Sequence, residues 1–141
     1  MKKMINTSFV YAIAAMAGGV FYREFTKFNG FTARTSLGLV HTHLFLLGML
    51  FFLVAALFAK ALPLLTHKRF RLFYGLYNAG VCVTAAMLLV RGVLQVLAVP
   101  VSRALDASVS GIAGVGHIMT GVGLIVFFTM LRSLAPSPSK S

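Results

Sequence analysis

Acidic residues are almost missing from this chain. Its 141 residues include two acids, Glu24 and Asp106, against thirteen Lys and Arg, which gives a formal net charge of +11. Neither acid has an evident partner, so carboxylate-based enzyme chemistry is not expected. In a soluble protein so much positive charge would suggest nucleic-acid binding. Here the basic residues lie mostly between apolar runs, where they orient helices and meet anionic lipid head groups, so no nucleic-acid partner is expected.

Cysteine is equally scarce. The single thiol, Cys82, lies inside an apolar run, which excludes a disulfide framework and a cysteine-based metal site. Hydrophobic residues, by contrast, are abundant: they make up 59% of the chain, and the mean hydropathy is +0.92. This composition is typical of an integral membrane protein.

Four apolar stretches are each long enough to cross a bilayer as a helix, which takes about 20 residues. We expect an all-α integral membrane protein, one domain over residues 1–141, with spans at 4–22, 37–59, 73–99 and 109–131 and a disordered polar tail at 134–141. Ser108 or Ser110 is expected to cap the last helix. The first stretch could also be a signal peptide, but it has no clear cleavage signature, so we expect a retained span.

The distribution of basic residues predicts the orientation of this four-helix bundle in a bacterial cytoplasmic membrane. With both termini in the cytoplasm, the outer side carries four basic residues: Arg23, Lys27, Arg34 and Arg103. The cytoplasmic side carries eight: Lys2, Lys3, Lys60, Lys68, Arg69, Arg71, Arg132 and Lys140.

Histidines inside the spans are the main functional signal, because an imidazole in lipid needs a partner. His41 and His43 lie about 4 and 6 residues below the outer end of the second span, and His117 about 8 below that of the fourth. Arg91, in the third span, lies at a similar depth. Two histidine-bearing helices and an arginine are therefore expected to meet in the outer third of the membrane.

A haem would satisfy these groups. No acid lies within the expected spans, so a haem propionate could pair with Arg91. His41 and His43 point about 200° apart on a helix, so only one of them is expected to bind the same iron. Glycines beside the histidines could clear room for a macrocycle: Gly48 in the second span and Gly114 and Gly121 around His117.

Two other functions stay open at this point. His41, His43 and His117 could bind copper or zinc, although the divergence of the first two disfavours one compact site. The chain could also be a structural or transport protein without a cofactor, in which the glycines serve close helix packing.

The run His41-Thr42-His43-Leu44, preceded by Arg34, resembles the second helix of the catalytic subunit of haem-copper oxidases, above all the nitric oxide reductase and cbb3-type branches. There a His-Thr-Asn-Leu-like run follows an arginine, and its histidine ligates a low-spin haem b near the outer face. The resemblance implies that His41 is the haem ligand, that Thr42 matches the adjoining threonine, and that His43 occupies the asparagine position. We expect Arg34 to help Arg91 neutralise the propionates. A second register, matching the cytochrome c oxidase branch, makes His43 the ligand.

The resemblance covers about twenty residues of one helix. That family has twelve spans and a His-Pro-Glu-Val-Tyr-like copper motif; this chain has four expected spans and no such motif, so a complete oxygen-reducing centre is not implied. A homotrimer of four-span chains could mimic the twelve-span core. The whole chain also resembles a family of short, uncharacterised four-span bacterial membrane proteins. The expected function is thus a b-type haem protein in electron transfer or redox or gas sensing.

Overall fold

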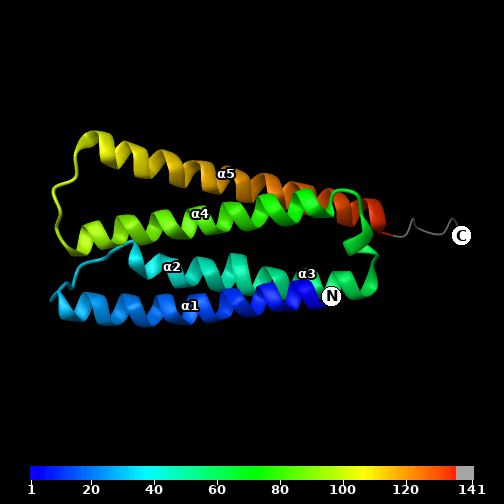
Figure 1. Cartoon of the computed structure of the whole chain (residues 1–141), viewed down its shortest axis with the longest axis horizontal. Coiled ribbons are helices and arrows are strands. Elements are labelled where there is room, and N and C mark those ends of the chain that lie inside the picture. Colours follow the sequence, from blue (N-terminus) through cyan, green and yellow to red (C-terminus); the bar gives the residue numbers. More distant parts are fainter. Residues whose placement is uncertain (136–141) are drawn as a thin grey trace, which may run out of the picture.

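Four long helices run up and down along one axis (Figure 1). The structure is a computed structural model and describes residues 1–135. Helix α1 (Lys2–Phe28) is followed by the second span, which consists of α2 (Leu37–His43), the π-helical segment η1 (Leu44–Leu50) and α3 (Phe51–Ala61). A short 3-10 turn, η2 (Leu64–Thr66), leads to α4 (Phe70–Val96), and α5 (Arg103–Leu134) completes the bundle. All four are long and apolar enough to span a membrane, as expected for a multi-pass membrane protein.

The helix ends follow from local chemistry. Gly30 takes φ +60 in the turn after α1, a left-handed conformation that glycine adopts without strain. Leu62 is extended before Pro63 and ends α3, since proline disfavours a helical residue before it. Helix α4 stops at Val96, three residues before the expected end, because Ala98 turns to φ 49 ahead of Pro100.

The start of the last helix corrects a sequence-based expectation. Neither Ser108 nor Ser110 caps α5; both donate their hydroxyl hydrogens to carbonyls within the helix. Ser102 is the cap: its backbone is extended, and its Oγ accepts a hydrogen bond from the Leu105 N–H at 3.2 Å. The helix therefore begins at Arg103 and includes Asp106 in its first turn. At its other end α5 includes Leu134; of the expected tail, residues 136–141 lie outside the described part.

The bundle is built as two helical hairpins. Helix α1 packs along the whole second span, and α4 packs along α5, while α2 contacts α4 and so joins the hairpins. In Figure 1 the helices accordingly lie in the order α1, second span, α4, α5. An aromatic cluster fills the core where the hairpins meet: Phe51, Phe52, Phe73, Tyr77 and Phe127.

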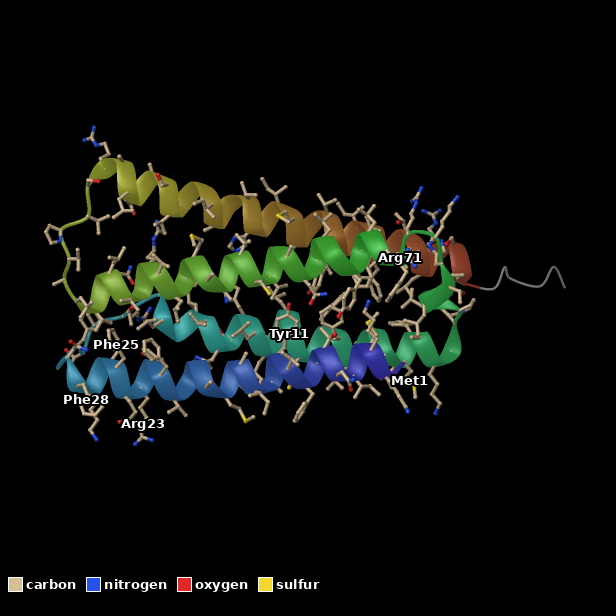
Figure 2. All side chains as sticks on the ribbon, in the orientation of Figure 1. Met1, Tyr11, Arg23, Phe25, Phe28 and Arg71 are labelled. Carbon is tan, nitrogen blue, oxygen red and sulfur yellow. The ribbon has the colours of Figure 1, made fainter. Side chains whose placement is uncertain are left out.

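Charge divides the molecule into two unlike ends. The start of α1, the turn after α3 and the end of α5 lie together, and Figure 2 shows Met1 and Arg71 at this end. Arg23 and Phe28 lie at the other end, together with both acids of the described chain. We call the first the basic end and the second the mixed end.

Candidate functional site

His43 and His117 lie next to each other, although 74 positions separate them in sequence. His43 is the last residue of α2, and His117 lies midway along α5. Their ring centroids are 6.3 Å apart, and the ring planes are almost perpendicular at 89°. The two imidazoles therefore bridge the two hairpins.

Each ring is oriented by the same kind of hydrogen bond, from its Nδ1 to the backbone carbonyl four residues earlier. Nδ1 of His43 lies 2.8 Å from the carbonyl oxygen of Leu39, and Nδ1 of His117 lies 2.8 Å from that of Ala113. A carbonyl oxygen only accepts, so each Nδ1 must carry the proton and donate it. In a neutral ring the lone pair is then on Nε2. A backbone partner that fixes the tautomer in this way is common for metal-ligating histidines.

The ring separation agrees with two imidazoles on opposite sides of one metal ion. A bond from imidazole nitrogen to a transition metal is about 2.0 Å, and the ring centre lies roughly 1.1 Å further on, so the two centres would be about 6.2 Å apart. This spacing also lies within the range of an edge-to-face ring contact. The centroid separation is thus close to the one expected for two imidazoles on opposite sides of one metal ion.

Two glycines beside His117 border open space. A Cβ added to Gly114 or Gly121, one turn to either side of His117, would meet nothing within 4 Å. Gly48 is different, since a Cβ there would collide with the ring of Tyr11. Of the three glycines singled out from the sequence, two thus border open space, and the third allows α1 to pack against η1.

His41 is placed away from this pair. Its side chain lies against Gly18 and Gly19 of α1, and its ring stacks on that of Tyr22 with centroids 6.3 Å apart. Its Nδ1 is buried and has no hydrogen-bond partner among the described residues. Thr42 is exposed and donates its hydroxyl hydrogen to the carbonyl of Leu39. Within residues 1–135, no three His, Cys, Asp or Glu side chains gather into one metal site.

Arg91 has a carboxylate partner, contrary to the expectation that none would be available. Its Nη2 lies 3.0 Å from Oδ1 of Asp106 and also donates to Oγ of Ser110. The contact arises because α5 begins at Arg103, which brings Asp106 alongside α4. Arg34 lies in the loop before α2 and lines a shallow pocket with Tyr22 and Gln95.

The two histidines of the pair lie at a common depth, but Arg91 does not share it, contrary to the expectation that all three meet in one layer. Ser110, which Arg91 contacts, precedes His117 by two helical turns, or roughly 10 Å. Leu37, whose backbone lies against Gly92, precedes His43 by roughly 9 Å. The histidine pair is therefore level across the two hairpins and lies about 10 Å inward of Arg91.

A polar cluster between α1 and α4 was not anticipated from the sequence. The hydroxyl of Tyr11 donates to Oδ1 of Asn78 at 2.9 Å and lies 3.6 Å from Sγ of Cys82. Figure 2 shows Tyr11 near the middle of the bundle. The signal was Asn78 itself, because an amide inside a span needs a hydrogen-bonding partner on a neighbouring helix.

Comparison with known proteins gives a family and no activity. Searches of curated proteins and of solved structures found no match. Residues 1–134 match the family described as "Protein of unknown function (DUF2871)". Since the match covers nearly the whole chain, this four-helix membrane protein belongs to that family.

Proposed function

We propose that this protein binds one haem b within the membrane, with His43 and His117 as the two axial ligands, and that it transfers electrons. The observation that carries the proposal is the imidazole pair, whose centroids lie 6.3 Å apart and whose Nδ1 atoms both donate to backbone carbonyls. Of the two registers of the haem-copper oxidase resemblance, this assignment corresponds to the one in which His43 is the ligand.

Two features near the pair support a porphyrin. Gly114 and Gly121 leave the face of α5 beside His117 open, and Arg91 lies about two helical turns toward the mixed end, within reach of a propionate. Arg91 already neutralises Asp106, so the propionate would share the guanidinium with that carboxylate. His41 takes no part, because it packs against α1.

Two axial histidines favour electron transfer over gas binding. A haem supplies a one-electron couple at its iron, and an iron with two imidazole ligands has no open position for oxygen or nitric oxide. The role of this chain is then to hold both imidazoles in their tautomers and to exclude water with the apolar helices around them.

A homotrimer is part of the proposal. His117 and its neighbouring glycines lie on an exposed face of α5, so a haem there would keep one edge uncovered within a single chain. Packing of a second copy against this face would cover that edge, and three copies would give a twelve-span assembly. The native mass of the purified protein tests this: a mass of three chains supports the trimer, and a mass of one or two chains rejects it.

The absorption spectrum of protein purified from haem-replete cells tests the function. We expect a Soret band and sharp reduced α and β bands typical of two axial histidines. His43→Ala and His117→Ala should each remove most of the bound haem, because each deletes an axial ligand.

Two matched variants control for non-specific effects. His41→Ala, in the same turn of the second span, and His67→Ala, in the turn before α4, should keep the haem spectrum. A colourless protein would refute haem binding, and if it carried stoichiometric copper or zinc, it would establish the metal-binding alternative. A normal spectrum in both ligand variants would refute the ligand assignment.

A further inference from the structure

A basic pocket lies at the basic end of the bundle, between the start of α1 and the turn before α4. Three permanently charged side chains line it, those of Lys3, Lys68 and Arg71, together with Leu65, Thr66, His67 and Phe70. Within residues 1–135 no acid lies at this end, since Glu24 and Asp106 are both at the mixed end. The pocket therefore concentrates positive charge that no carboxylate of the described chain offsets.

An apolar groove continues from this pocket along α1 and α4. Lys3 lines both the pocket and the groove, so the two are continuous. Its ammonium group is held at the junction, 3.9 Å from the ring centroid of Tyr74 and 5.7 Å from that of Phe70.

Polarity changes in steps along the groove. Asn6 and Thr7 follow Lys3, and the Thr7 hydroxyl forms a 2.6 Å hydrogen bond with that of Tyr74. Further inward the lining includes Val10, Ala14 and Leu44. Tyr11, Asn78 and Cys82 also line this part, and their polar groups contact one another. The groove thus offers a cation, then hydroxyl and amide groups, then mostly apolar side chains. A phospholipid has matching parts in the same order: a phosphate, glycerol esters and an acyl chain.

We propose that this pocket and groove bind one molecule of an anionic phospholipid. The phosphate lies among Lys3, Lys68 and Arg71, the glycerol region lies beside Asn6 and Thr7, and one acyl chain follows the groove between α1 and α4. An anionic head group is selected because each nearby Lys or Arg attracts it, whereas the ammonium of a zwitterionic lipid opposes these charges. Neither His43 nor His117 lines the pocket or the groove, so this proposal does not rest on haem binding.

Lipid retention in native mass spectrometry, with thermal stability measured in parallel, tests the proposal. Detergent-purified protein is given phosphatidylglycerol, phosphatidylcholine or inorganic phosphate alone. We expect retention of one phosphatidylglycerol and a higher melting temperature with this lipid only. Equal retention of phosphatidylcholine would overturn the selectivity, and equal stabilisation by inorganic phosphate would show a plain anion site instead.

Two pairs of variants separate the head group from the chain. Lys3→Ala and Arg71→Ala should each weaken phosphatidylglycerol binding about fivefold, as expected for one charge near a lipid surface. Lys60→Ala, at the same end but outside the pocket, should leave binding unchanged. Ala14→Phe should fill the groove and reduce lipid retention, whereas Met16→Phe on the same helix should not. If Ala14→Phe retains lipid as well as Met16→Phe does, the acyl chain does not lie in this groove.

Discussion

At the scale of single residues, glycines determine how closely α4 and α5 approach. A Cβ added to Gly116 would lie 2.6 Å from Oγ1 of Thr84 and 2.9 Å from its backbone nitrogen. Gly80 and Gly123 meet backbone atoms of the opposite helix in the same way. These three glycines form a seam along which two backbones touch, as small residues allow in membrane helix pairs.

Gly116→Ala should therefore destabilise the protein by about 1–3 kcal/mol, because its methyl group has no space and the helices must separate. Gly111→Ala on the same helix is the matched control. A Cβ at Gly111 would meet nothing within 4 Å, so this change should be neutral or stabilising by up to about 1 kcal/mol. Unfolding of the purified protein in increasing SDS measures both variants, and equal stability of the two would contradict the assignment of the seam.

Arg91 and Asp106 give a second prediction, which applies if haem binds as proposed. The guanidinium lies about 10 Å from the histidine pair, and positive charge near the iron favours the ferrous form. Arg91→Gln should lower the midpoint potential and Asp106→Asn should raise it, each by some tens of mV at this distance. A spectroelectrochemical titration measures both. Shifts of the same sign would show that charge at this pair does not act on the iron.

The sequence indicated which glycines and histidines lie within the spans, but not what each of them contacts. Gly48, Gly114 and Gly121 look alike in a hydrophobic run, yet only contact with Tyr11 distinguishes the packing glycine from the two that border open space. Likewise His41 and His43 were separable by helix geometry, but the sequence could not say which of them faces α5. The carboxylate beside Arg91 was missed because it depends on where α5 begins.

At the scale of elements, the second span was the easiest to predict and contains the least expected detail. Its bounds, expected at 37–59, are Leu37–Ala61. The uncharged run ends at Ala59, and Pro63 stops the helix two residues after Ala61. The π-helical segment Leu44–Leu50 inside it could not be predicted from the sequence. Its residues are all apolar or glycine, so there is no alternation of polar and apolar positions that would show the number of residues per turn. It begins directly after His43 and connects this histidine to the lower half of the span.

Deletion of Leu46 tests the importance of this segment. A π turn contains one residue more than an α turn, so the segment absorbs one extra residue without changing the faces of the helix on either side. Removing the exposed Leu46 should therefore restore an α-helix and leave His43 in register with α3. We expect retained haem and unchanged helical content by circular dichroism, as for Leu46→Ala, which keeps the length. Loss of haem in the deletion variant alone would show that the π segment positions His43 in a way that an α-helix cannot.

At the scale of the whole molecule, the unequal charge of the two ends predicts the orientation in the membrane. Seven of the described basic residues lie at the basic end, which we expect in the cytoplasm: Lys2, Lys3, Lys60, Lys68, Arg69, Arg71 and Arg132. In a Cys82→Ser background, Arg103→Cys should react with a membrane-impermeant maleimide in intact cells. Lys68→Cys should react only after lysis, and the reverse pattern would invert the orientation.

The position of the histidine pair has a mechanical consequence for the assembled protein. His43 belongs to one hairpin and His117 to the other. A ligand held by both imidazoles would therefore join two halves that otherwise meet through side-chain packing and a few hydrogen bonds, such as that from Tyr77 to the Leu47 carbonyl. Such a ligand would stabilise the folded state by about 2.7 kcal/mol at a hundred times its dissociation constant. The stability of the bundle would then increase with the fraction of protein that holds the ligand. Cells short of the ligand would contain a less stable protein, which is degraded faster.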